Sequence, residues 1–208
     1  MSYQPVVAIV GVTGAVGAEF IATMDKRAFP VGKLKALASA RSAGKTIDFR
    51  GEKITIEELT EQSFEGADIA LFSAGGGISR KFAPAAVKAG AVVVDNSSAF
   101  RMDPNVPLVI PEINANRIRD HKGIIANPNC SAITALVPLW PIHKQNRIKR
   151  VILSTYQAAS GAGASNGGIG GIDARQTRRA AVHAEGDPAS LCLQRVQPQH
   201  RDRSRDRL

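Results

Sequence analysis

Short apolar runs separated by polar, glycine-containing segments dominate the first 160 residues of the chain. Most of these runs are rich in β-branched residues without regular polar alternation, which is typical of strands buried on both faces of a parallel sheet. The predicted strands are Val6–Val10, Lys33–Ala38, Asp68–Ser73, Ala91–Asp95 and Gly123–Ala126. The pattern therefore predicts a sheet whose strands are mostly parallel.

Longer segments between these runs predict helices. They are Ala18–Met24, Ile78–Ala89 and Ser131–Trp140, with a shorter helix over Asn114–Arg119. Strands that alternate with helices are typical of a doubly wound, Rossmann-like α/β fold. We also expect a short strand or hairpin over Lys53–Leu59. The proline-bracketed stretch Pro107–Ile113 predicts an edge strand or extended segment.

The chain divides into three parts on this pattern. Residues 1–145 are predicted to form the Rossmann-like domain. Arg147–Tyr156 is a further strand-like run, and residues 146–164 are expected to begin a second α+β domain for substrate binding and dimerisation. Residues 165–208 have a different composition, rich in Arg and poor in apolar residues towards the end, and we expect them to be poorly ordered.

A glycine-rich turn follows the first predicted strand directly. It reads Gly11-Val12-Thr13-Gly14-Ala15-Val16-Gly17. Glycines at this spacing allow a tight turn, close approach of the backbone to a pyrophosphate and close helix packing, with the phosphates at the helix start. The turn therefore predicts a dinucleotide site, and the alternative is a glycine-rich turn without a ligand.

The segment after the second strand bears on the choice of cofactor. An NAD-specific site usually places Asp or Glu there to hold the ribose hydroxyls. This chain instead has Ser39, Arg41 and Ser42 and no carboxylate. A guanidinium and two hydroxyls suit the 2′-phosphate of NADP, so we expect NADP. The alternative is that Arg41 is an ordinary solvated loop residue.

Two further loops follow predicted strands. Ser73-Ala74-Gly75 opens a helix whose start can face the cofactor, and the loop 96–102 follows the strand Ala91–Asp95. Ligands of open α/β sheets bind at the carboxyl ends of strands, so Asn96, Ser98 and Arg101 are candidates for substrate contacts. Arg101 can clamp a phosphate or carboxylate, or it can make a salt bridge within the loop.

Cys130 lies at a predicted strand-to-helix turn, within Asn127-Pro128-Asn129-Cys130. Backbone N–H groups at a helix start carry partial positive charge and favour the nucleophilic thiolate. A buried structural thiol is the alternative. The tight turn and the upstream dinucleotide motif favour a catalytic cysteine. The other cysteine is Cys192, and we expect both to be reduced thiols rather than a disulfide.

Several motifs together resemble aspartate-β-semialdehyde dehydrogenase over about residues 4–164. They are Gly11 to Gly17, Ser73-Ala74-Gly75-Gly76, Val94 to Met102, Asn127 to Cys130, and Ser154-Thr155-Tyr156-Gln157. The resemblance implies NADP-dependent reductive dephosphorylation of L-aspartyl-4-phosphate to aspartate semialdehyde, in the biosynthesis of lysine, threonine and methionine. N-acetylglutamyl-phosphate reductases share the architecture and the cysteine chemistry, and a non-catalytic NADP-binding fragment is a further alternative.

The same resemblance implies roles for individual residues. Cys130 matches the nucleophile that forms a thioester, Arg101 a phosphate-binding residue, Gln157 a substrate-orienting residue, and Asn129 the residue that helps to hold the acyl group. The residues implied to border the cofactor are Gly11, Thr13, Gly14, Ala15, Val16, Gly17, Ser39, Arg41, Ser42, Ser73, Ala74, Gly75, Asn96, Ser160 and Gly161. The family also implies a homodimer, and no metal is expected.

The resemblance stops near Ser165. The distant histidine that serves the family as acid/base is not recognisable, so we assign no such residue. Codons can be chosen for residues 191–207 so that reading one nucleotide later gives a peptide resembling the family's own downstream segment. We therefore interpret residues 165–208 as the product of a frameshift near 165–170 and expect little activity from this chain.

The formal net charge of +9 raises the alternative of a nucleic-acid-binding protein. Basic residues of the first 164 positions are scattered and not interleaved with aromatic residues. An anionic cofactor and substrate explain the excess, so we expect no specific nucleic-acid partner. Because no apolar run is long enough to span a bilayer and the first residues do not resemble a signal peptide, we expect a cytoplasmic protein without a membrane partner.

Overall fold

A seven-stranded sheet forms the centre of the computed structural model, which describes residues 3–155 and 178–182, the latter as backbone only. The strand order is β3-β4-β2-β1-β5-β6-β7. The bounds are β1 Val6–Val10, β2 Lys33–Ala38, β3 Thr46–Phe49, β4 Glu52–Glu58, β5 Ile69–Phe72, β6 Val92–Asp95 and β7 Ile124–Ala126. All neighbours pair in parallel except β3 and β4, which form an antiparallel hairpin. The predicted doubly wound, mostly parallel sheet is confirmed.

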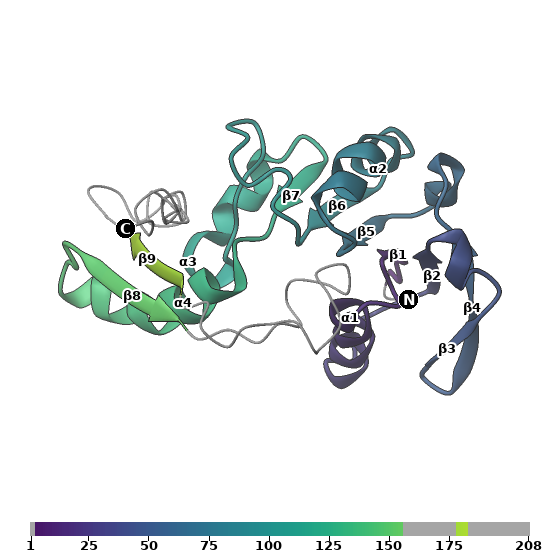
Figure 1. Ribbon diagram of the computed structural model, residues 1–208, viewed down its shortest axis with the longest axis horizontal. Helices are drawn as coiled ribbons and strands as arrows, with labels where there is room; N and C mark the ends of the chain where they lie inside the picture. The colour runs from purple at the N-terminus through teal and green to yellow at the C-terminus, as the bar shows by residue number, and fades with distance from the viewer. Residues whose placement is uncertain (1–2, 156–177, 183–208) are drawn as a thin grey trace, which may run out of the picture.

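Helices cover both faces of this sheet. Helix α1 (Ala15–Lys26) and helix α2 (Gly76–Lys88) lie on opposite sides of it (Figure 1). The face towards α1 contributes Val7 and Ile9 to one apolar cluster, together with Met24 of the helix. The other face buries Phe72 against Phe64 of the 3-10 helix η2 (Glu61–Phe64), with ring centroids 5.7 Å apart. Strands apolar on both faces are buried by these two layers, as the sequence predicts.

Helix α4 (Cys130–Gln145) follows β7 and leads away from the sheet. Its Leu136 packs with Ile110 in a separate small core beside helix α3 (Pro111–Asn114). Strand β8 (Val151–Thr155) pairs antiparallel with β9 (Arg178–Val182) in a second sheet of two strands, next to α4 (Figure 1). The division of the chain at about residue 145 remains a prediction.

Two sequence predictions need correction. The extended segment was predicted to reach Ile113, but only Leu108 forms a bridge, to Ala126, and Pro111 begins α3. Proline suits the first turn of a helix because the N–H that it lacks has no intrahelical partner there. The helix expected over Ser131–Trp140 runs from Cys130 to Gln145, with Pro138 and Pro141 inside it.

The remaining predicted elements agree with the structure to within a few residues. Helices α1 and α2 are longer than expected, and the short helix after α3 is the 3-10 helix η3 (Ala115–Asp120). Within the described residues, no helix has the length and apolar character needed to cross a membrane.

Candidate functional site

Five loops follow one another along the edge of the sheet where the parallel strands end. Main-chain hydrogen bonds connect the end of each strand to its neighbour. From β2 to β7, they are Gly11 N–H to Leu37 O (2.9 Å), Ser73 N–H to Val10 O (3.0 Å), Asn96 N–H to Phe72 O (2.9 Å) and Asn127 N–H to Asp95 O (2.8 Å). The loops predicted from the sequence to bind cofactor and substrate therefore share one edge, as parallel strands require.

The glycine turn between β1 and α1 is packed too closely for side chains. A Cβ atom on Gly17 would lie 2.4 Å from Gly11 O, and one on Gly11 would lie 2.8 Å from Ser73 O. Gly11 also has a φ of 86°, in the left-handed region that favours glycine. Glycine is thus required at both positions. Without a side chain at Gly17, α1 can pack against the turn, and without one at Gly11, the turn can pack against the loop after β5.

The start of α1 offers donors to an anion. Gly14 is its N-cap, makes no side-chain capping hydrogen bond, and no acidic residue lies in the first turn. Such a helix start, at the point where the chain order reverses between β1 and β5, suits a pyrophosphate. Thr13 is exposed beside it. The described residues thus fit a dinucleotide at this turn.

The segment after β2 forms the 3-10 helix η1 (Ala40–Ser42) at the neighbouring strand end. Ser39 is its N-cap and accepts a hydrogen bond from Ser42 N–H through its main-chain oxygen (2.8 Å). Ser42 is buried, whereas Arg41 is exposed. Arg41 is therefore accessible to a ligand, and the Ser42 side chain is mostly covered.

The loop after β5 completes the cofactor half of the edge. Gly75 has a φ of 90° and caps α2, again without a side-chain capping bond. The preceding residues Ser73 and Ala74 lie against Gly11. Arg80, one turn into α2, donates to Ala99 O over 3.2 Å and so ties this helix to the loop after β6.

A buried carboxylate organises the loop after β6. Asp95 has no exposed surface, and its Oδ1 accepts from the Ser79 hydroxyl of α2 (2.7 Å). Ser97 donates to it twice, from its hydroxyl to Oδ2 (2.7 Å) and from its N–H to Oδ1 (3.2 Å). A buried charge needs such partners, and their positions determine where the loop 96–101 begins.

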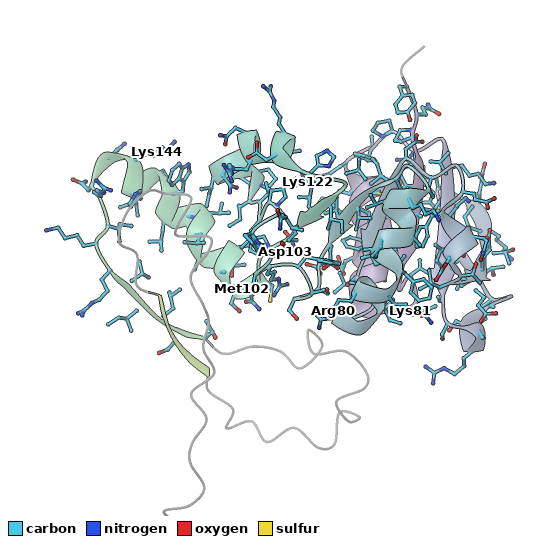
Figure 2. All side chains as sticks on the ribbon, turned by 90° about the horizontal axis from the view of Figure 1, so that it is seen from above. Arg80, Lys81, Met102, Asp103, Lys122 and Lys144 are labelled. Carbon is cyan, nitrogen blue, oxygen red and sulfur yellow. The ribbon has the colours of Figure 1, made fainter. Side chains whose placement is uncertain are left out.

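Arg101 connects this loop to the turn that carries Cys130. Its Nε donates to Asn127 O (2.8 Å) and its Nη2 donates to Asn96 O (3.0 Å). Burial lowers the pKa of Arg101 from its usual value, while the negative charges of Asp95 and the Cys130 thiolate act in the opposite direction. Figure 2 shows the next residues, Met102 and Asp103, between α4 and the sheet, with Arg80 on α2 nearby.

Cys130 is exposed and is the first residue of α4. Asn129 caps the helix, its Oδ1 accepting from Ser131 N–H over 2.9 Å. This bond orients the Asn129 amide so that its oxygen points towards the helix and its NH₂ group points away from the helix. The thiol Sγ lies 4.0 Å from the Ser131 hydroxyl. The expected exposed cysteine at a strand-to-helix turn is present, so the buried structural thiol is excluded.

Three predicted site residues, Gln157, Ser160 and Gly161, lie outside the described residues, as does Cys192. Two histidines are described, and both support the backbone. His121 Nδ1 accepts from Gly123 N–H (3.0 Å), and His143 Nδ1 accepts from Ile148 N–H (3.2 Å). Among residues 3–155, no group of three His, Cys, Asp or Glu side chains is arranged to hold a metal.

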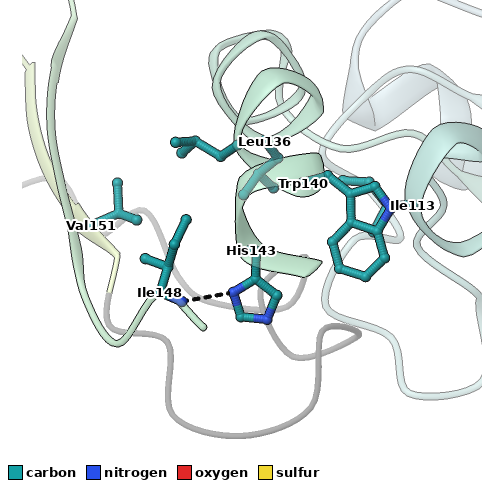
Figure 3. Close-up of a pocket in the computed structure, with 7 residues that line it drawn as sticks. Ile113, Leu136, Trp140, His143, Ile148 and Val151 are labelled. Atoms are coloured by element: carbon teal, nitrogen blue, oxygen red, sulfur yellow. Dashed lines mark hydrogen bonds between the residues drawn. The ribbon is translucent and has the colours of Figure 1, made fainter. Parts of the chain in front are cut away.

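His143 belongs to an apolar pocket between α3, α4 and β8 (Figure 3). Its ring stacks on Trp140, with centroids 5.9 Å apart. The remaining lining consists of aliphatic side chains, those of Ile113, Leu136, Leu139, Ile148 and Val151. His143 lies 13 residues after Cys130 on the same helix, so at about 1.5 Å per residue the pocket is roughly 20 Å from the thiol along the helix axis. The pocket is therefore not beside Cys130.

The sequence interpretation missed Asn127 and Asp95 as members of the site. Asn127 Nδ2 donates to Asn96 Oδ1 over 2.6 Å, which joins the loops after β6 and β7 through side chains. The apolar pattern alone places Asp95 only at the end of a predicted strand. An acidic residue that ends an apolar run and precedes a polar loop is the signal that could have identified it.

Comparison with known proteins agrees with this arrangement. The family described as semialdehyde dehydrogenase, NAD binding domain, matches residues 6–121. Aspartate-semialdehyde dehydrogenase of Synechocystis is 55% identical over 158 residues, covering 76% of this chain and 47% of the relative. That of Bacillus subtilis is 54% identical over 157 residues, covering 76% and 45%. The chain spans about half the length of the curated relatives it matches.

A solved structure shows the same relationship in three dimensions. Aspartate semialdehyde dehydrogenase II of Vibrio cholerae, crystallised in complex with ASA, superposes with a TM-score of 0.73 and 47% sequence identity. The superposition covers 77% of this chain and 53% of that one. Sequence and fold thus agree on the relatives of this molecule.

Proposed function

Since the chain belongs to the semialdehyde dehydrogenase family, we propose that it carries the cofactor-binding and nucleophilic part of an aspartate-semialdehyde dehydrogenase. The observation that supports this most directly is the position of Cys130. The exposed thiol begins α4 at the same sheet edge as the glycine turn, with Arg101 between the loops. The named relatives, 55% and 54% identical over the aligned residues, favour aspartyl phosphate over acetylglutamyl phosphate as substrate.

In the proposed reaction the Cys130 thiolate attacks the acyl carbon of L-aspartyl-4-phosphate, and inorganic phosphate leaves with the electrons of the broken C–O bond. The product of this step is a thioester on Cys130. When bound, the nicotinamide cofactor supplies the hydride that reduces this thioester to the aldehyde and releases the thiolate. The chain's own contribution is to present the thiol and to stabilise negative charge around it.

We assign the anionic groups of the substrate to Arg101 and Asn129. The Nε and Nη2 groups of Arg101 already donate to main-chain carbonyls, so the Nη1 side of the guanidinium is the side we assign to phosphate. Capping directs the Asn129 oxygen to the helix, and its NH₂ group is the donor we assign to the acyl oxygen. Gln157 remains an assignment from the family resemblance.

We assign NADP to the glycine turn and to the loops Ser39–Ser42 and Ser73–Gly75, with Asn96, Ser160 and Gly161 as further contacts. The exposed guanidinium of Arg41, without a carboxylate nearby in sequence, supports NADP over NAD. Arg41→Glu should weaken NADPH binding far more than NADH binding, measured by fluorescence titration of the chain. Arg119→Glu, an exposed exchange in η3, is the matched control. Equal loss of both cofactors would contradict the assignment.

The proposed chemistry is tested in a version extended by the family's carboxyl-terminal half. Cys130→Ser should abolish phosphate-dependent reduction of NADP by aspartate semialdehyde but leave NADPH binding unchanged. Turnover by the serine variant near that of the parent would overturn the proposal. Activity with the acetylglutamyl compound alone would favour the reductase alternative.

For the 208-residue chain itself we propose little or no turnover, because the acid/base residue and further substrate-binding residues of the family are not recognisable in its sequence. Loss of a general acid or base alone commonly costs about 10²–10⁴ in rate. The frameshift near 165–170 stays a prediction on residues outside the described part, and sequencing the gene tests it. A homodimer of the complete enzyme and a cytoplasmic location also remain proposals.

A further inference from the structure

Asn127 connects the turn that carries Cys130 to β6 and to the loop after it. It lies three residues before Cys130. Three of its polar groups form hydrogen bonds with the end of β6 and the loop that follows it. Its N–H donates to Asp95 O (2.8 Å), its side-chain Nδ2 donates to Asn96 Oδ1 (2.6 Å), and its carbonyl accepts from Arg101 Nε (2.8 Å).

The two asparagines and the arginine form a closed set of contacts. Arg101 donates to the main-chain oxygens of both Asn96 and Asn127, and the two asparagines bond to each other through their side chains. One edge of a planar guanidinium is therefore held by two carbonyls whose separation the amide pair controls. Rotation of either loop would break at least two of the three hydrogen bonds.

We propose that Asn127 is a positioning residue, which with Asn96 holds the Arg101 guanidinium and the Cys130 turn in one arrangement before any substrate binds. This inference rests on the proposed role of Cys130 as nucleophile. In this proposal Asn127 does not contact the substrate. Asn96 helps to position Arg101 in addition to contacting the cofactor. The positive charge of Arg101 then attracts anionic electrophiles towards the Cys130 turn.

The test measures the thiol directly and requires neither cofactor nor turnover. Cys130 of the full chain is alkylated with the neutral reagent iodoacetamide and with the anionic reagent iodoacetate, and the modified Cys130 peptide is quantified by mass spectrometry. The ratio of the two rates, relative to the same ratio for a free thiol peptide, reports positive charge near the sulfur. Arg101→Gln gives the ratio expected when that charge is lost.

Asn127→Ala should lower the ratio about threefold or more, towards the Arg101→Gln value, because the guanidinium is no longer held. Asn96→Ala should lower the ratio by the same factor. The double variant should lower it no further than either single variant, since all three variants remove the same hydrogen bond between the two asparagine side chains. Asn105→Ala, a truncation in the exposed turn 103–106, is the matched control and should leave the ratio unchanged.

Thermal unfolding by circular dichroism accompanies each measurement, and Asn96→Ala decides the question if Asn127→Ala does not fold. Folded variants with the parent's ratio would overturn the inference, and so would an unchanged ratio in Arg101→Gln. Failure of the proposed dehydrogenase activity in an extended version would leave the alkylation result intact. The two hypotheses therefore fail independently.

Discussion

The turn after β1 and the turn after β7 both connect a parallel strand to a helix at the same edge of the sheet, but they are held in different ways. The first is held by close packing, since Cβ atoms on Gly11 or Gly17 would overlap main-chain oxygens. The second is held by hydrogen bonds that the side chains of Asn127 and Arg101 donate and that of Asn129 accepts.

The helices that follow the two turns also differ in how their first residues are capped. Helix α1 has no side-chain cap at Gly14, whereas Asn129 caps α4 and uses one of its first N–H groups. The uncapped start of α1 leaves N–H donors for the phosphates of a dinucleotide. The cap of α4 fixes Asn129, which precedes Cys130, the residue that we propose as the nucleophile.

The largest effect should follow Gly17→Ala, which places a Cβ 2.4 Å from Gly11 O and 2.6 Å from Val12 O. Because both contacts are main-chain atoms, α1 must shift, and we expect a loss of about 2–3 kcal/mol in the free energy of unfolding with loss of NADPH binding. Urea unfolding and cofactor titration measure this. Gly77→Ala in α2 has open space at its Cβ and should not destabilise the protein. Similar losses in both variants would contradict the packing account.

A smaller effect is expected at the far end of α1, where Arg50 fastens the β3–β4 hairpin to the helix. Its Nη2 donates to Phe29 O (2.7 Å) and Met24 O (3.3 Å), and the guanidinium lies 4.8 Å from the Phe49 ring centre. Arg50→Ala should lower the free energy of unfolding by about 1–2 kcal/mol. Arg27→Ala is the control. The Cys130 alkylation ratio should not change, and a change would show that the β3–β4 hairpin and the Cys130 turn are coupled.

The turn after β7 can be weakened by removing the cap of α4, a change that introduces no steric overlap. Asn129→Ala removes the acceptor of Ser131 N–H and should cost about 1 kcal/mol in the free energy of unfolding. Asn129→Ser retains a capping oxygen but has no NH₂ group. It should keep the stability and still lose turnover in the extended enzyme. Normal turnover in the serine variant would remove Asn129 from the acyl site.

The smallest effect concerns Asp68, at the opposite end of the sheet from both turns. Its hydrogen bonds from the Tyr3 hydroxyl and from Val6 N–H (2.7 Å) hold its pKa below the usual value. The ionised carboxylate therefore stabilises the folded state above the unfolded-state pKa, and this contribution disappears as pH falls through the folded-state pKa. The difference in melting temperature between parent and Asp68→Asn should shrink as pH is lowered. A constant difference would show that ionisation plays no part.

Much of this molecule follows from local sequence. Val6–Val10 and Lys33–Ala38 match the observed strands residue for residue. The first is a continuous apolar run, which is typical of a strand whose two faces are both covered. The glycine turn was equally predictable, since a left-handed φ at Gly11 and close contacts at Gly17 restrict those positions to glycine. The exposure of Cys130 followed from its place at a strand-to-helix turn. The end of α4 was not predictable, because Pro141 locally favours the end of a helix, whereas Trp140 and His143 in the last part of α4 pack with Ile148 and Val151 further along the chain.

The contacts of the second turn could only be decided by the tertiary structure. Asn96 and Asn127 are 31 positions apart, and their hydrogen bond exists because β6 and β7 are neighbours in register, with Asp95 opposite Ala126. The same register turns Arg101 towards main-chain oxygens from two loops. A sequence records which groups are available, but whether a guanidinium meets a substrate, a carboxylate or a carbonyl depends on which strand ends lie side by side.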